Sequence, residues 1–194
     1  MLPTKHSHKS FFRIELPTST KVPEKIRKGI NNINAVWTDI EYLHNLFHLI
    51  FSDLNEETND QKLSMKFSAL IVFSMDSHIH LNIIGTLLEK NIYYHLKKQC
   101  AEINSVKMKY KSLWKEISEK RHLYIIHREK VDFYKTHRSI ASTDPNNLFK
   151  YAAVIEDKNG KIKTIEFIPL KDLDTAHECL KEIQEALNLF FESK

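Results

Sequence analysis

The fold is set by a long amphipathic segment near the N-terminus, residues 23–54, which reads PEKIRKGINNINAVWTDIEYLHNLFHLIFSDL. Its apolar positions recur at alternating spacings of four and three, the period of a helix that buries one face. These seam positions are Ile26, Ile30, Ile33, Trp37, Ile40, His44, Phe47, Phe51 and Leu54. Because Pro23 suits the first turn of a helix, we predict one helix of about 30 residues with a single polar seam member, His44.

Two further segments show the same spacing and predict two more long helices. The seam of the second contains Phe67, Ile71, Ser74, His78, Leu81, Gly85, Leu88 and Ile92. The seam of the third contains Ile103, Val106, Tyr110, Leu113 and Ile117, with helical character continuing to about residue 134 and Ser118 able to cap a fresh helix. Polar residues 55–60 predict the first reversal, and Asn91 or Asn104 the second. Gly85 indicates either a break or a close helix crossing.

The C-terminal third contains the clearest β signal. Residues 149–157 and 161–168 flank Asn159-Gly160, a dipeptide suited to a tight turn, so we predict a β-hairpin over 149–168. The alternating residues 10–16 predict an N-terminal strand that could join it, and residues 142–147 read as a loop. Pro169 closes the hairpin, and a final helix is predicted over 171–192 with Asp172 or Asp174 as its cap.

The expected fold is therefore mainly α. We predict a single domain over residues 1–194, built as an up-down bundle of four to five helices. A small β-hairpin or three-stranded sheet is inserted before the last helix.

The composition excludes several classes of site. Only 3 of 194 residues are Gly, and they lie far apart, so no phosphate-binding glycine loop and no G-x-S-x-G hydrolase motif is present. Cys100 and Cys179 form no C-x-x-C pair, which excludes a zinc ribbon or a thioredoxin-like site. The longest apolar run, residues 69–73, is too short to span a membrane, and no secretory signal is apparent. We expect a soluble cytoplasmic protein without a cofactor and without membrane association.

Positive charge is concentrated in one segment. The whole chain has a net charge of +4, but residues 107–138 contain ten Lys or Arg and four Asp or Glu, a local net charge of +6. Such a stripe is typical of a polyanion binder, and it is also typical of a solvated helix face.

The histidines suggest a metal site as an alternative. Glu41-x-x-His44 and Glu119-x-x-His122 match the Glu-x-x-His pattern of di-metal carboxylate bundles, and His44 and His48 are one helical turn apart. Such a site needs two further glutamates in seam positions of the other helices. The candidates Glu89, Glu178, Glu182 and Glu185 all lie beside seam residues. A di-metal bundle is therefore the second alternative, and no metal is expected.

The basic segment contains Arg121, the polar His122, four residues and then His127. Here the chain resembles the HEPN family of small helical bundles, whose signature is an Arg, a polar residue and a His at this spacing. Two long helices before the motif and one after it extend the resemblance over most of residues 23–192. The resemblance implies a homodimer with a composite ribonuclease site, acting as a toxin or phage-defence effector with a possible antitoxin protein as partner.

The residue types themselves suit metal-independent RNA cleavage. A histidine can move the proton of a 2′-hydroxyl, and an arginine can stabilise the charge on the phosphate, so Arg121 and His127 are the predicted catalytic residues. On an ideal helix they point about 240° apart, and two copies of the chain would be needed to bring them to one phosphate. His122 and Tyr124 are predicted to support them. The predicted RNA-phosphate contacts are Lys115, Lys120, Arg128 and Lys130.

A different function uses the same charge without catalysis. A non-catalytic HEPN-like module that binds RNA, a nucleotide or a partner protein is the first alternative.

Overall fold

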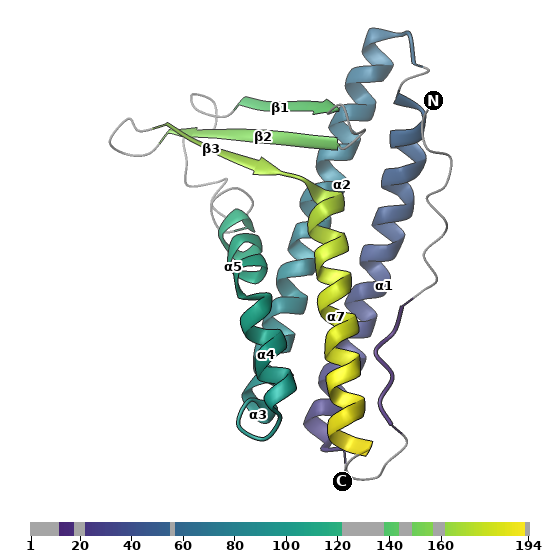
Figure 1. The fold of residues 1–194 in the computed structure, drawn as a ribbon. Helices are drawn as coiled ribbons and strands as arrows, with labels where there is room; N and C mark the ends of the chain where they lie inside the picture. Colours follow the sequence, from purple (N-terminus) through teal and green to yellow (C-terminus); the bar gives the residue numbers. More distant parts are fainter. Residues whose placement is uncertain are drawn as a thin grey trace.

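The computed structural model describes residues 12–17, 22–54, 57–121, 138–143, 149–156 and 162–192. Long helices run side by side along one direction, and a small sheet lies across their upper part (Figure 1). The mainly helical fold with a three-stranded antiparallel sheet before the last helix confirms the predicted fold class.

Helices α1 (Glu24–Ser52) and α2 (Asp60–Leu87) form the antiparallel pair that the seam spacing predicts. Asn59 caps α2, because its side-chain oxygen accepts from the amide of Lys62 at 3.0 Å. The buried positions of α1 include Ile26, Ile30, Ile33, Trp37, Ile40 and Phe47. The predicted reversal near residues 55–60 is therefore confirmed by the helix bounds.

The second reversal lies at neither predicted asparagine. α2 runs on through a π-helical turn, η2 (Leu88–Tyr93), into α3 (Tyr94–Leu96), and α4 (Ala101–Lys109) begins after extended Cys100. Asn91 lies within the helical turn η2, and its side-chain amide donates to the carbonyl of Leu87 at 3.1 Å.

The predicted third helix is divided at Tyr110 into α4 and α5 (Lys111–Lys120). Its predicted seam is correct, since all five seam residues are buried: Ile103, Val106, Tyr110, Leu113 and Ile117. Ser118 is an interior residue of α5, so its prediction as a helix cap is wrong.

Three strands form the sheet in the order β1-β2-β3: β1 (Arg138–Thr143), β2 (Phe149–Glu156) and β3 (Ile162–Phe167). The predicted hairpin is thus confirmed, although its turn at Asn159-Gly160 lies outside the described residues. The third strand comes from residues 138–143, two of which were predicted as loop.

The predicted N-terminal strand is wrong over the described residues 12–17, which are extended but belong to no sheet. Ile14 instead pairs with the side chain of Asn34 on α1, through its amide at 2.9 Å and its carbonyl at 3.0 Å. An asparagine side chain offers both a donor and an acceptor, so it can make the two backbone hydrogen bonds that a neighbouring strand would otherwise make.

The last helix, α7 (Pro169–Glu192), starts two residues earlier than predicted. Asp172 is therefore inside the first turn, where its backbone amide donates to the carbonyl of Ile168 at 3.1 Å. Its side chain is buried. Because Asp172 and Asp174 both lie inside the helix, neither residue is the cap.

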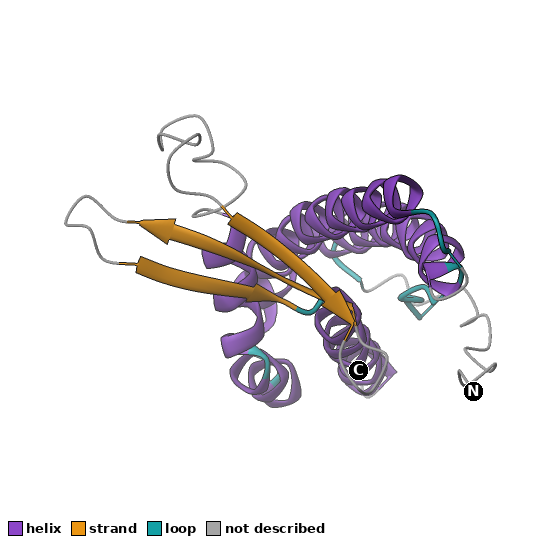
Figure 2. Ribbon diagram, turned by 90° about the horizontal axis from the view of Figure 1, so that it is seen from above, coloured by secondary structure: helices purple, strands orange, loops and turns teal. Residues whose placement is uncertain are grey.

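Two apolar clusters make up the core. The larger fills the bundle between α1, α2, α4, α5 and α7. The smaller lies under the sheet, where Tyr151 and Phe167 stack at 4.5 Å between ring centroids, and its buried members are Phe47, Leu54, Leu70, Phe149, Tyr151, Ile165 and Phe167. Figure 1 shows the sheet above α5 and at the start of α7, beside the upper part of α2, which extends past it, and Figure 2 shows the same sheet from above.

The continuous stretch Asp60–Leu96 is long and apolar enough to cross a membrane by length and composition alone. The longest unbroken apolar run, residues 69–73, is short because polar residues interrupt this stretch. Its length therefore did not indicate that the stretch is apolar on average. In the structure 33% of its most apolar window is buried, and the core helix of a soluble protein meets the same criterion.

Both described glycines are sites of close packing. A Cβ at Gly85 would lie 2.9 Å from Cε3 of Trp114, which confirms the predicted close crossing, and a Cβ at Gly29 would overlap Cβ of Asn91. We predict that Gly29→Ala lowers the free energy of unfolding by about 1–3 kcal/mol, because the steric overlap outweighs the higher helix propensity of alanine. Urea denaturation followed by circular dichroism measures this, with the exposed Asn32→Ala on the same helix as control. Equal stability of Gly29→Ala and wild type would contradict the packing.

Candidate functional site

The structure describes three of the predicted site residues, Lys115, Lys120 and Arg121. The other five, His122, Tyr124, His127, Arg128 and Lys130, lie outside the described residues. The site is therefore built from the end of α5 and from the helices packed against it.

Lys120 does not lie on the surface, as a phosphate contact would. Its side chain is only 7% exposed, and its ammonium bonds the carboxylates of Asp172 at 3.1 Å and Glu116 at 2.7 Å. The ammonium also lies 5.5 Å from the ring centroid of Phe167. Position 120 follows Leu113 and Ile117 at spacings of four and three, so it continues the buried seam of α5. The prediction that Lys120 binds RNA phosphate is corrected accordingly.

Asp172 joins three helices at this point. Its Oδ2 atom accepts from Nζ of Lys120 on α5 and lies 2.9 Å from Nε2 of His78 on α2. Asp172 itself is on the first turn of α7, and His78 packs edge-on against Phe167 at the end of β3. We call Lys120, Asp172 and His78 the buried polar cluster. It lies where the bundle meets the sheet.

The geometry of His78 determines which of its ring nitrogens donate. Nδ1 lies 2.7 Å from the carbonyl oxygen of Ser74, which can only accept, so Nδ1 donates. Nε2 faces Asp172, and an ionised carboxylate is also only an acceptor. With Asp172 ionised, His78 therefore donates from both nitrogens, as an imidazolium.

The ionised state of Asp172 follows from its neighbours. Burial alone would raise the pKa of the Asp172 carboxyl, but the hydrogen bonds and charges of His78 and Lys120 outweigh burial and hold its pKa below the ordinary value of 3.8. The cluster thus pairs one carboxylate with two cationic groups, and Glu116 at the rim supplies a second carboxylate to Lys120.

Arg121 follows the cluster directly and differs from it. The side chain is half-buried, and its Nε atom is buried without a hydrogen-bond acceptor. Within the described parts of the chain Arg121 forms no ion pair, and the carboxylates of Asp172 and Glu116 both contact Lys120. An arginine in this setting has positive charge available for an anion.

The surface of α5 before Arg121 also carries positive charge. The Lys115 side chain is 73% exposed, and its loose contact with Glu119, at 3.7 Å, is between two well-exposed groups. Lys115 is therefore placed as the prediction requires for a phosphate contact, although such a position alone does not distinguish binding from solvation.

The described residues do not bring together the ligands of a di-metal site. No group of three or more His, Cys, Asp or Glu side chains is close enough to hold a metal ion within those ranges. Glu41 bonds Arg13 at 2.9 Å and the amide of Phe12 at 3.1 Å, while Nε2 of His44 and Nε2 of His48 contact each other at 3.0 Å. Glu41 thus holds the N-terminal segment against α1.

The cysteines are placed as inert thiols. Both are free and buried, and burial raises the pKa of Cys179 to about 12. A thiol that stays protonated at neutral pH is a poor nucleophile.

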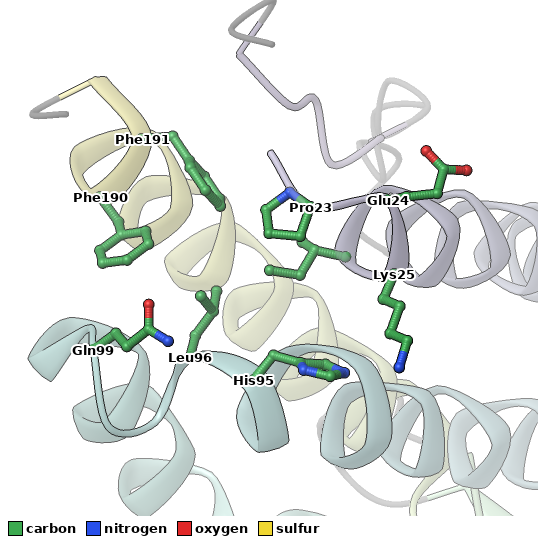
Figure 3. Close-up of a pocket in the computed structure, with 9 residues that line it drawn as sticks. Pro23, Glu24, Lys25, His95, Leu96, Gln99, Phe190 and Phe191 are labelled. Atoms are coloured by element: carbon green, nitrogen blue, oxygen red, sulfur yellow. The ribbon is translucent and has the colours of Figure 1, made fainter. Parts of the chain in front are cut away.

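A hollow of about 390 Å³ lies at the other end of the bundle, between the start of α1 and the end of α7 (Figure 3). Phe190, Phe191, Leu96 and Pro23 form its apolar part, and His95, Gln99, Glu24 and Lys25 stand around it. None of the three described site residues, Lys115, Lys120 and Arg121, lines it. The hollow is therefore separate from the candidate site at Arg121.

The buried polar cluster predicts a strong dependence on Asp172. Asp172→Ala leaves two buried cationic groups without their carboxylate, and we expect the free energy of unfolding to fall by about 3–5 kcal/mol. Glu116→Ala removes a well-exposed partner of the same lysine and should change the unfolding midpoint little. Urea denaturation of both variants tests this. Similar midpoints for the two variants would contradict the bridging role of Asp172.

The depressed pKa of Asp172 predicts how stability depends on pH. A carboxyl whose pKa is lower in the folded protein stabilises it above the unfolded value, near 3.8, and this contribution is lost as the pH falls through the folded value. The stability difference between wild type and Asp172→Asn should therefore shrink as the pH falls below the unfolded value of Asp172. Denaturation midpoints measured on both sides of that value test this. A difference that grows as the pH falls below it would contradict the assignment.

No protein-family model, curated protein or solved structure with which the chain was compared matches it. The candidate site is defined by Arg121 and by the contacts within the buried polar cluster.

Proposed function

We propose that this protein is a metal-independent endoribonuclease of the HEPN type, acting in the cytoplasm as a dimer with a composite Arg/His site. The observation that supports it best is the positive charge of Arg121, which no acid among the described residues pairs. Its half-buried guanidinium follows a cluster whose carboxylates are engaged by Lys120, so an RNA phosphate is the kind of group that would complete it.

In the proposed reaction the 2′-hydroxyl oxygen of the substrate attacks the adjacent phosphorus, and the bond to the 5′-oxygen breaks. His127 takes the proton from the 2′-hydroxyl, and a histidine of the pair returns a proton to the leaving 5′-oxygen. Arg121 stabilises the charge on the phosphate oxygens. The products carry a 2′,3′-cyclic phosphate and a 5′-hydroxyl, and no metal ion is needed. His122 and Tyr124 are proposed to position the phosphate and the base.

The buried polar cluster would serve this reaction by fixing the end of α5. A guanidinium must be held in place to contribute to catalysis, and Lys120 anchors the preceding residue to α7 and α2 through Asp172 and His78. The exposed Lys115 would contact phosphates along the strand, together with Arg128 and Lys130, without reading the sequence.

The biological setting of the proposal comes from the HEPN resemblance alone. It is that of a toxin or phage-defence effector, with a protein antitoxin as a possible partner.

A non-catalytic RNA-binding or nucleotide-binding module is the second candidate. It is favoured by the exposed Lys115 and by Arg121, which forms no ion pair with a described residue, because both cations can contact a phosphate chain without catalysis. It predicts RNA affinity that falls steeply with salt and no cleavage product.

Cleavage assays separate these functions. Wild-type protein incubated with total RNA in EDTA should yield fragments with 2′,3′-cyclic phosphate ends, and it should leave single-stranded DNA intact. Arg121→Lys keeps the charge but loses the planar fork, so we expect at least a tenfold lower cleavage rate, and none with His127→Ala.

Lys111→Ala, at an exposed position of the same helix, is the matched control and should cleave at close to the wild-type rate. Cleavage by Arg121→Lys and His127→Ala at the wild-type rate would remove the catalytic assignment. Salt-sensitive RNA binding without any product would favour the binding module.

A further inference from the structure

Two histidines on α1 face each other across one helical turn. Nε2 of His44 lies 3.0 Å from Nε2 of His48, and the two rings meet edge to face with 4.3 Å between their centroids. Residues four apart lie one above the other on a helix, so the backbone of α1 itself brings the pair together. Both side chains are half-buried beside Phe47, which is buried. Neither histidine belongs to the proposed ribonuclease site.

The contact between the two nitrogens determines what this pair can bind. A neutral imidazole has one nitrogen that donates and one that accepts, so a nitrogen–nitrogen hydrogen bond requires an unprotonated Nε2 on one ring. When the other ring carries its proton on Nδ1, both Nε2 lone pairs face the same point. Imidazole nitrogens are ligands that suit divalent zinc, copper, iron and nickel. The pair therefore offers two converging ligands to a transition-metal ion.

The separation of the two nitrogens indicates which of these metals fits. With 3.0 Å between the nitrogens, two metal–nitrogen bonds of about 2.0–2.1 Å enclose an angle of about 95°. Tetrahedral Zn²⁺ would need about 3.3 Å between the nitrogens. Square-planar and tetragonal sites, where neighbouring ligands are at right angles, are typical of Ni²⁺ and Cu²⁺. The geometry thus favours Ni²⁺ or Cu²⁺, with water in the remaining positions.

The charge of this part of the chain also favours a cation. Between Lys28 and Lys62 there is no Lys or Arg, and six residues are acidic: Asp39, Glu41, Asp53, Glu56, Glu57 and Asp60. Lys28 is the nearest basic residue on α1, and it lies 16 residues before His44, about 24 Å along the helix. A metal ion at the histidine pair would therefore meet no repulsion from a lysine or arginine of its own helix.

We infer that His44 and His48 form a binding site for one divalent transition-metal ion with the ligand geometry of Ni²⁺ or Cu²⁺. The ion would join two positions of the turn of α1 on which the sheet packs. Phe47 belongs to this turn, and its ring lies 5.4 Å from that of Phe149 on β2 and 6.2 Å from that of His48, between centroids. Because only the folded helix brings the two imidazoles together, binding of the ion stabilises the folded protein.

Urea denaturation of the full chain at neutral pH, with and without Ni²⁺, tests the site. We expect micromolar Ni²⁺ to raise the unfolding midpoint of wild type, and Mg²⁺ at the same concentration to leave it unchanged, because Mg²⁺ prefers oxygen ligands. An unchanged midpoint with Ni²⁺ would overturn the inference and leave the contact as a hydrogen bond alone. An equal shift with Mg²⁺ would also overturn it, since the acidic residues would then bind cations without the imidazoles.

Glutamine variants show whether both imidazoles are needed. His44→Gln and His48→Gln each keep a polar side chain and lose one ligand, so we expect the Ni²⁺-dependent shift to disappear in both. Each variant is compared with its own metal-free midpoint, which removes the effect of the substitution on stability. His95→Gln on α3 is the matched control and should keep the full shift, because the residues four before and four after it are Asn and Gln. A shift that persists in both His44→Gln and His48→Gln would overturn the inference.

Isothermal titration calorimetry counts the ions. The chain has 11 histidines, and the other ten are the same in wild type and His48→Gln, so the difference between the two proteins reports on this pair. We expect wild type to bind one Ni²⁺ more than His48→Gln does, and equal numbers would contradict the site. Neither measurement depends on RNA cleavage, which is tested in EDTA, so this inference and the proposed function can fail separately.

Discussion

One carboxylate holds the junction between the bundle and the sheet. Asp172, on the first turn of α7, bonds Lys120 on α5 and His78 on α2 at the point where Phe167 ends β3. Its loss would leave two cationic groups in an apolar setting. Buried charges of this kind add little net stability compared with a well-packed apolar core, but they specify which groups must meet. The arrangement of α2, α5 and α7 around the candidate site therefore depends on this residue.

The same interaction determines which cation is available to a ligand. Lys120 and Arg121 are adjacent and look equivalent in sequence, yet the structure commits the first to Asp172 and Glu116 and leaves the second without an acid among the described residues. Of these two adjacent cations, only Arg121 keeps a charge that no described acid engages. This difference supports the proposal that Arg121, and not Lys120, contacts a phosphate.

Much of the fold could be predicted from spacing, because burial of a helix face depends on local periodicity. The seams of α1, α4 and α5 and the Gly85 crossing follow from single segments of sequence. The wrong predictions depend on contacts between distant segments. Residues 12–17 alternate like a strand, but the side chain of Asn34 meets their backbone. Asn91, where a reversal was expected, packs against Gly29 on α1. Such partners are not visible in the segment itself.

The candidate site was predicted only in part, for the same reason. Arg121 was found through a local motif, while Asp172 was interpreted as a helix cap and Lys120 as a surface cation. A signal was present: Ser74, His78 and Lys120 are polar residues at seam positions, and polar groups buried in one bundle must find one another. Spacing identified these positions without showing which helices would bring them together.

A double-mutant cycle between Lys120 and Asp172 tests most directly whether this carboxylate is needed to balance the buried lysine. Free energies of unfolding would be measured by urea denaturation for wild type, Asp172→Asn, Lys120→Met and the double variant. Asp172→Asn alone should be strongly destabilised, and the double variant should recover at least about 1 kcal/mol of that loss, because the buried charge has been removed with its partner. Costs that simply add, with no recovery in the double variant, would contradict the account.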